Sequence, residues 1–210
     1  MGSLSRIGKN VLQRCLMPGA FIWRLPSGTD CALTFDDGPD PLHTPQILEI
    51  LGRHRIKASF FLVGEYALRA PELVRRIAQE GHCVASHTFS HRELPSLSRN
   101  ELARELTDCK EVLRQLTGID TRLIRPPRGR VDARSLVRLK QWNYRVVHWS
   151  KTYSDYLQDG SSALLMRIRE RGLEPRDIAL FHDTNPHTVA AVEQMLPLWQ
   201  AAGRSFVSLQ

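Results

Sequence analysis

Hydrophobic and polar positions alternate in blocks along the chain from Thr29 onward. Short apolar runs, typical of buried strands, are each followed by a segment with the spacing of an amphipathic helix. The pattern predicts strands at 31–35, 57–63, 83–87, 121–127, 145–150, 177–182 and 205–209. Between them it predicts helices at 44–54, 70–81, 98–118, 132–142, 161–171 and 188–203. Capping signals support one of the helix starts, because Ser98 can form a capping box with Glu101.

Strand–helix alternation, repeated about seven times, predicts a parallel sheet that forms either a barrel or a doubly wound sheet. In both architectures chemistry gathers at the carboxyl ends of the strands. No repeat, low-complexity stretch or Gly/Ser linker interrupts residues 29–210. We therefore expect these residues to form one domain, for which a chain of 210 residues is long enough.

Residues 1–28 precede this alternation and form a separate N-terminal segment. One face of a helix here would carry apolar side chains, at Ile7, Val11, Leu12 and Cys15. Basic side chains would lie elsewhere on that helix, at Arg6, Lys9 and Arg14. We favour a short helix that covers the barrel. The alternative is a basic amphipathic helix in peripheral contact with an anionic membrane.

Composition is that of an ordinary soluble protein, with 42% hydrophobic and 24% charged residues. No segment approaches the roughly 20 apolar residues that span a bilayer, and no signal peptide stands out near Met1. The four cysteines form no CxxC pair, which argues against a zinc finger or a redox dithiol and fits a reducing compartment. We therefore expect a cytoplasmic location, with membrane association left open by the N-terminal segment.

The net charge of +7 is compatible with anionic partners. The arginines are nevertheless scattered, with no basic run and no basic patch interleaved with aromatic residues. We interpret most of them as solvated surface and expect no nucleic-acid partner. The sequence indicates no oligomeric state.

Two adjacent aspartates, Asp36 and Asp37, end the first apolar run. Ionised neighbours repel each other, and both resist burial unless a cation compensates. Either the pair lies in a solvated turn, or a metal ion and an arginine neutralise it.

Two histidines follow another predicted strand. His87 and His91 are four residues apart, so a helical turn would bring both imidazoles to one ion. Taken alone, such a pair is more often part of a polar loop or hydrogen-bonded in a core. One aspartate of the 36–37 pair would complete a zinc-type set of two histidines and one aspartate, with a position open for water.

Three more stretches with polar residues follow strand ends. Arg125, in RPPRG, could bind a buried carboxylate through its planar fork, or it could be an exposed loop residue. His182, in IALFHD, could act as a general acid near neutral pH if an aspartate lies nearby. Asp155, in HWSKTYSDY, is such an aspartate.

These five stretches resemble the five motifs of the polysaccharide deacetylases, carbohydrate esterase family 4, which share the NodB-homology domain. TFDDGP stands intact at 34–39 and the H-S/T-x-x-H motif at 87–91, followed in order by RPPxG and LxHD. The resemblance covers 29–210. It implies a distorted (β/α) barrel and a hydrolase that removes N-acetyl, sometimes O-acetyl, groups from sugars. It also implies one divalent metal ion, with zinc favoured over cobalt, nickel or manganese.

The resemblance further implies roles for individual residues. Asp37, His87 and His91 would hold the metal. Asp36 would be the catalytic base, kept in place by Arg125.

Other roles carry over in the same way. His182 would be the general acid, oriented by Asp155. Leu180 would line the pocket for the acetyl methyl group. A backbone N–H near Pro127 or Arg128 would stabilise the oxyanion.

The chain departs from the family pattern at three positions. Arg128 stands where an aromatic residue is usual, and could bias the groove toward an anionic glycan or simply point into solvent. Thr152 replaces the first acid of the fourth motif, and Tyr156 replaces its tryptophan in the substrate groove. Because Asp155 aligns with the second acid, we expect activity to survive.

The leading hypothesis is therefore a metal-dependent deacetylase whose partner is an N-acetylated oligosaccharide, polysaccharide or lipid-linked glycan. The alternative is a non-catalytic or O-deacetylating carbohydrate-binding member of the same fold. Intact Asp36 and His182 speak against the non-catalytic alternative.

Overall fold

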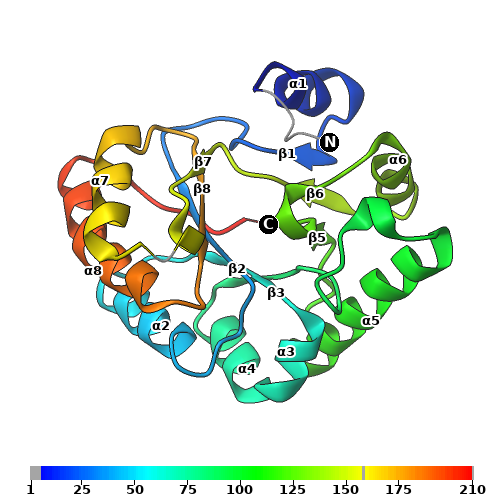
Figure 1. Cartoon of the computed structure of the whole chain (residues 1–210), viewed down its shortest axis with the longest axis horizontal. Helices are drawn as coiled ribbons and strands as arrows, with labels where there is room; N and C mark the ends of the chain where they lie inside the picture. The colour runs from blue at the N-terminus through cyan, green and yellow to red at the C-terminus, as the bar shows by residue number, and fades with distance from the viewer. Residues whose placement is uncertain (1–5, 158, 210) are drawn as a thin grey trace.

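The structure is a computed structural model that describes residues 6–157 and 159–209, without the side chains of residues 6, 15 and 16. Within these residues, eight strands form one parallel sheet in the order β1-β6-β5-β4-β3-β2-β8-β7. The sheet curls into a distorted (β/α) barrel with helices around its outside (Figure 1). The strands are β1 (Phe21–Ile22), β2 (Ala32–Asp36), β3 (Ser59–Leu62), β4 (Cys83–Ser86), β5 (Leu123–Ile124), β6 (Arg145–Val147), β7 (Lys151–Thr152) and β8 (Ile178–His182).

From β2 onward the helices alternate with the strands as the sequence predicts, except that α3 was not predicted and no helix separates β6 from β7. They are α1 (Arg6–Val11), α2 (Thr44–Arg53), α3 (Gly64–Arg69), α4 (Pro71–Gln79), α5 (Arg99–Thr117), α6 (Ala133–Gln141), α7 (Ser161–Arg171) and α8 (Pro186–Ala201). Short turns are the π-helical η1 (Leu12–Leu16) and the 3-10 turns η2 (Leu94–Ser96), η3 (Pro127–Gly129) and η4 (Asp155–Leu157). The capping box predicted at Ser98 is present at the start of α5. No helix in the described part of the chain is long and apolar enough to cross a bilayer.

The strand prediction at 205–209 is wrong. This segment makes one isolated parallel bridge, between Cys31 and Phe206. It cannot continue along β2, because β3 and β8 already occupy both edges of that strand. Farther along, the N–H of Leu209 donates to the side chain of Ser59 instead of to a strand. The sheet also contains two strands that were not predicted, β1 and β7. Each is only two residues long, too short to show a pattern in the sequence.

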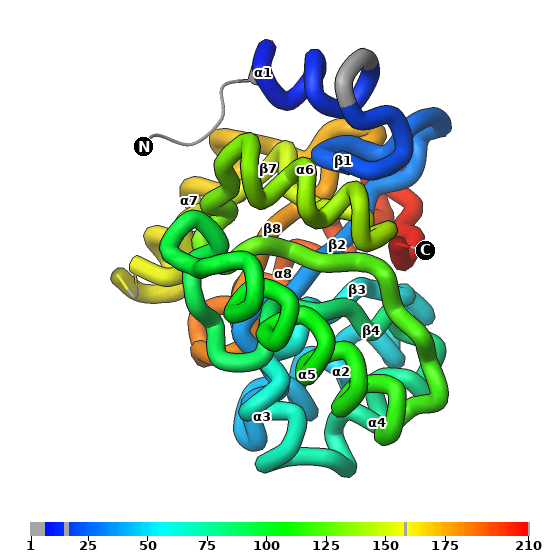
Figure 2. Tube along the Cα trace, turned by 90° about the vertical axis from the view of Figure 1, so that its right-hand side faces the viewer, coloured from blue at the N-terminus to red at the C-terminus, as the bar shows by residue number. Residues whose placement is uncertain are grey.

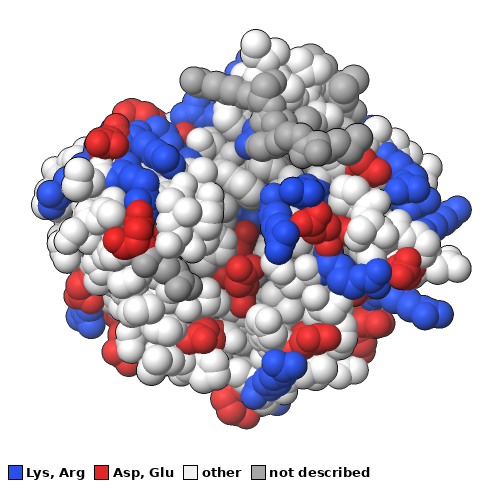
Figure 3. Space-filling model, viewed as in Figure 1, with Lys and Arg blue, Asp and Glu red and all other residues white. Residues whose placement is uncertain are grey.

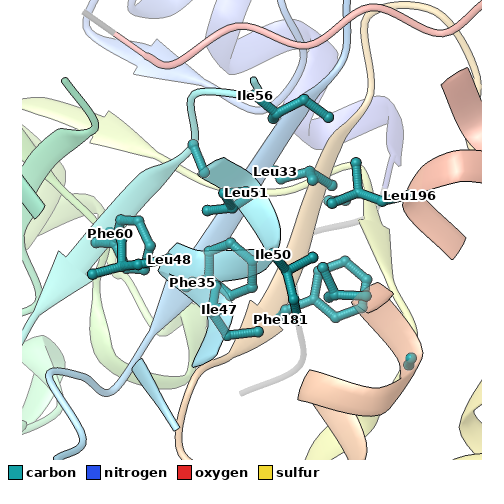
Figure 4. Packing of buried hydrophobic residues seen from close by; sticks show 14 of the residues in the cluster. Leu33, Phe35, Ile47, Leu48, Ile50, Leu51, Ile56, Phe60, Phe181 and Leu196 are labelled. Atoms are coloured by element: carbon teal, nitrogen blue, oxygen red, sulfur yellow. The ribbon is translucent and has the colours of Figure 1, made fainter. Parts of the chain in front are cut away.

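The main core lies between one face of β2, β3 and β8 and the helices that cover it. Phe35 stacks on Phe60 and Phe181, with ring centroids 5.1 and 6.1 Å apart. Figure 4 shows these rings together with side chains from α2 and α8. Because side chains alternate along a strand, Phe35 on this face leaves Thr34 and Asp36 on the opposite, inner face.

The N-terminal helix α1 lies beside β1 at one side of the barrel (Figures 1 and 2). Its packing differs from the predicted amphipathic pattern, because Lys9 is buried while Ile7 is 77% exposed. The Lys9 Nζ donates to the carbonyl of Trp149 at 3.2 Å and lies over the rings of Trp23 and Trp149. Burial lowers the pKa of Lys9 to about 8. A contact of this segment with a membrane stays a prediction.

Candidate functional site

The carboxyl ends of the parallel strands bring the five sequence stretches to one end of the barrel. The sheet register places Asp36, the last residue of β2, level with His182, the last residue of β8. His87 follows β4 directly and Arg125 follows β5. Figure 3 looks onto a face with acidic side chains in a hollow at its middle.

The two adjacent aspartates point to different partners. Asp36 is buried inside the barrel, where its Oδ1 accepts a hydrogen bond from Arg125 Nη1 at 2.6 Å. Asp37 has a left-handed backbone with a φ of 71°, which turns its carboxylate away from that of Asp36. The first residue is thus neutralised by a guanidinium and the second faces two imidazoles, which relieves their repulsion.

Arg125 is completely buried, and each of its nitrogens has a hydrogen-bond acceptor. Nη1 donates to Thr34 Oγ1 as well as to Asp36, Nη2 donates to the His148 carbonyl, and Nε donates to the Val147 carbonyl. Burial lowers the pKa of Arg125, and the charge of Asp36 acts in the opposite direction. The guanidinium is therefore locked in one position by strands β2 and β6.

Asp37, His87 and His91 form a cluster in which the potential ligand atoms lie within 4.8 Å of one another. Asp37 Oδ1 is 3.2 Å from His87 Nε2 and 3.1 Å from His91 Nε2. That oxygen is buried yet makes no hydrogen bond of acceptable geometry with the described residues. Burial would raise the pKa of Asp37, but the two imidazoles lower it well below its ordinary range.

The donor set of this cluster fits a divalent cation. His87 Nδ1 lies 2.7 Å from the Arg125 carbonyl, so this nitrogen carries the proton and leaves the Nε2 lone pair facing Asp37. Two imidazole nitrogens and one carboxylate oxygen are typical ligands of zinc, and three protein ligands leave room for water.

The segment from His87 to His91 does not form the helical turn that would stack two residues four apart. The segment is an irregular loop in which Thr88 and His91 have positive φ values of 69° and 58°. Glu105 of α5 holds this loop by accepting hydrogen bonds from the backbone N–H groups of Phe89 and Ser90. The imidazoles still converge, with ring centroids 4.9 Å apart, because the loop turns back on itself.

His182 faces the same end of the barrel and is bound to Asp155. Its Nδ1 lies 2.9 Å from Asp155 Oδ1, and its backbone N–H donates to Asp155 Oδ2. Thr188 also donates to that carboxylate, which is buried. Burial lowers the pKa of His182, but Asp155, together with the charges of Asp36 and Asp37, outweighs burial and raises it to about 9.

The residues expected to contact substrate lie around this centre. Leu180 is buried on the same face of β8 as His182, because the two are separated by one residue. Tyr156 is exposed, with its ring edge-on to His182 at 6.2 Å between centroids. Pro127 is buried in η3, whereas Arg128 is exposed and forms an ion pair with Glu93 at 3.1 Å.

Two glycines at this end of the barrel allow close approaches of neighbouring side chains. A Cβ on Gly38 would lie 2.5 Å from the carboxylate of Asp183, which accepts a hydrogen bond from Thr44. A Cβ on Gly129 would lie 2.5 Å from the ring of Trp149. The glycines in DDGP and RPPRG are visible in the sequence. The residues that they contact, Asp183 and Trp149, follow other strands and cannot be identified from the sequence.

A sequence profile of the polysaccharide deacetylase family matches residues 26–147. A peptidoglycan-N-acetylglucosamine deacetylase of Bacillus cereus is 35% identical over 86% of this chain and 66% of its own length, so the chain spans just under two thirds of that relative. A chitooligosaccharide deacetylase of Sinorhizobium fredii is 33% identical over 79% of this chain and 83% of its own length.

Solved structures of polysaccharide deacetylases have folds similar to that of this chain. The peptidoglycan N-acetylglucosamine deacetylase Bc1960 has a TM-score of 0.86 and 33% identity, covering 92% of each chain. A carbohydrate esterase family 4 pseudoenzyme from Bacillus anthracis has a TM-score of 0.84 over 92% of this chain and 68% of its own. At 24% identity, that second likeness concerns the fold alone.

Replacing Arg125 with leucine should lower the free energy of unfolding by about 3–5 kcal/mol, because Asp36 would stay buried without a counter-charge. Urea unfolding followed by circular dichroism measures this loss. Arg128→Leu is the matched control, since Arg128 is exposed and its loss should cost less than about 1 kcal/mol. Adding Asp36→Leu to Arg125→Leu should recover part of the stability. A loss of stability in the double variant equal to the sum of the losses in Arg125→Leu and Asp36→Leu would contradict the coupling.

Proposed function

The chain belongs to the polysaccharide deacetylase family, and on that basis we propose that it is a metal-dependent hydrolase removing N-acetyl groups from the amino sugars of a glycan. One observation carries this proposal. A buried aspartate held by an arginine, a second aspartate facing two histidines, and a histidine–aspartate pair lie together at one end of the barrel. Relatives of this chain are peptidoglycan and chitooligosaccharide deacetylases.

We assign the metal ligands to Asp37, His87 and His91. A bound divalent cation, with zinc favoured over cobalt, nickel or manganese, would polarise the acetyl carbonyl and lower the pKa of water. The His87 Nδ1–H bond to the Arg125 carbonyl keeps that imidazole in the tautomer and orientation a ligand needs.

Asp36 is the proposed base. Arg125 binds Oδ1 of this carboxylate, while its Oδ2 lies 3.9 Å from His87 Nε2, on the side of the metal ligands. In this position Asp36 can take a proton from water attacking the acetyl carbon. Pro127 has no backbone N–H, so the backbone N–H of the next residue, Arg128, is the proposed donor to the developing oxyanion.

His182 is the proposed general acid. Its raised pKa keeps the imidazole protonated at neutral pH, and Asp155 fixes Nδ1 so that Nε2 faces the reaction centre. From there it donates a proton to the departing sugar nitrogen, without which the tetrahedral adduct would revert. Leu180 and Tyr156 are the proposed contacts for the acetyl methyl group and the sugar.

Metal-loaded protein should release acetate from an acetylated amino-sugar panel, and Asp36→Asn should lower kcat by about 100-fold or more with the metal content unchanged. Acetate is measured enzymatically and metal by elemental analysis. Asp108→Asn, an exposed aspartate of α5, is the matched control and should retain full activity. A preparation with bound metal that releases no acetate from any panel member, N- or O-acetylated, would favour a non-catalytic protein.

The pH profile tests the role of His182. Activity should fall as pH rises through about 9, because the imidazole must be protonated to donate. Asp155→Asn removes the charge that raises this pKa, so the alkaline limb of kcat/KM should move to lower pH. An alkaline limb at the same pH in both proteins would mean that another group limits the reaction.

A further inference from the structure

A cavity of about 320 Å³ adjoins the proposed metal site and includes Asp37 in its wall. Its other lining residues come from the loop after β2, from α3 and its C-terminal end, and from the loop after β8, namely Pro39, Asp40, Pro41, Tyr66, Arg69, Ala70 and Thr184. Arg125, Arg128 and Tyr156 do not line it. Apart from Asp37, the cavity is therefore lined by residues outside the site described above.

We propose that this cavity is a subsite for a sugar that bears an anionic group, a carboxylate or a phosphate, recognised by Arg69. The inference rests on the proposed function, because this sugar would be joined to the one whose acetyl group is removed at the neighbouring site of Asp36 and His182. It specifies the substrate class as an acidic N-acetylated glycan.

The walls of the cavity suit a sugar ring. Pro39 and Pro41 hold a rigid backbone on one side, since proline fixes φ. Tyr66, on α3, is 38% exposed, so part of its ring is accessible, and its hydroxyl can donate or accept a hydrogen bond. An apolar wall with a few polar groups is the usual lining of a small-molecule site.

Among the described residues that line the cavity, Arg69 is the one cationic side chain. Arg69 has a side chain that is 72% exposed, and its guanidinium lies 5.5 Å from the Tyr66 ring centroid. Its ion pair with Glu65 is long, at 3.9 Å, and exposed, so it contributes little. A guanidinium free to form two parallel hydrogen bonds matches a carboxylate or a phosphate.

The two acidic residues of the cavity each lie close to a histidine. Asp40 Oδ1 accepts hydrogen bonds from the backbone N–H groups of Leu42 and His43 and lies 2.8 Å from His43 Nδ1. Asp37 faces the imidazoles of the metal cluster. Other arginines near the site also have close acidic partners, at 3.1 Å for Arg128 and 2.6 Å for Arg125. Within the described part of the chain, Arg69 differs from both because its one acidic partner, Glu65, is 3.9 Å away.

The test compares three substrates with the zinc-loaded protein: N-acetylchitotetraose, its C6-carboxylate derivative and its 6-phosphate derivative. The two charged substrates distinguish a carboxylate from a phosphate as the preferred group. The ratio of kcat/KM for a charged substrate over the neutral one should fall about tenfold in Arg69→Ala, the loss of one charge-assisted contact. The ratio should fall less in Arg69→Lys than in Arg69→Ala, and raised salt should lower the ratio in the wild type.

Arg75→Ala, at a partly exposed arginine of α4 paired with Glu72, is the matched control and should leave the ratio unchanged. Binding of the same oligosaccharides to the Asp36→Asn variant, by calorimetry, gives a readout that does not need turnover. Suppose that the charged oligosaccharides bind more tightly than the neutral one, that Arg69→Ala abolishes this preference, and that the wild type shows no turnover. This result would support the subsite and contradict the deacetylase proposal. Turnover with a ratio that is the same in wild type and Arg69→Ala would overturn the subsite alone.

Discussion

The buried ion pair between Arg125 and Asp36 is the interaction on which the site depends. Two neighbouring carboxylates at a strand end would otherwise repel each other and draw water into the barrel. The guanidinium neutralises one of them at 2.6 Å and is itself held by three backbone or hydroxyl oxygens of β2 and β6 and the residue after β6. With Asp36 fixed, the left-handed turn at Asp37 can direct the second carboxylate to the two histidines.

Hydrophobic packing of the same strand offsets the free-energy cost of burying this charge. On β2, Phe35 packs into the aromatic core while the neighbouring Asp36 faces inward, so hydrophobic burial anchors the strand that carries a charge. Most of the non-glycine residues with positive φ lie at the same end of the barrel. Positive φ values occur at Asp37, Thr88, His91, Arg128 and Ser154, all in loops that follow strands. Such conformations persist only where surrounding contacts enforce them, as Glu105 does for the loop after β4.

The alternation of strands and helices, and hence the parallel barrel, could be predicted from the sequence because each long element repeats its own period. The convergence of the five motifs followed from the rule that parallel strands end at one side. Local signals were insufficient elsewhere. The loop that joins His87 to His91 is shaped by Glu105, which is distant in sequence, and the strand at 205–209 is excluded because β2 has no free edge. The short strand β7 and the buried Lys9 likewise depend on tertiary neighbours.

Anomalous diffraction from crystals grown with zinc tests the division of labour between the two aspartates most directly. Data collected on both sides of the zinc absorption edge should give a single peak bounded by Asp37, His87 and His91, with Asp36 outside the ligand sphere and still bonded to Arg125. A peak elsewhere in the molecule, or a zinc ion ligated by Asp36 in place of Asp37, would contradict the account.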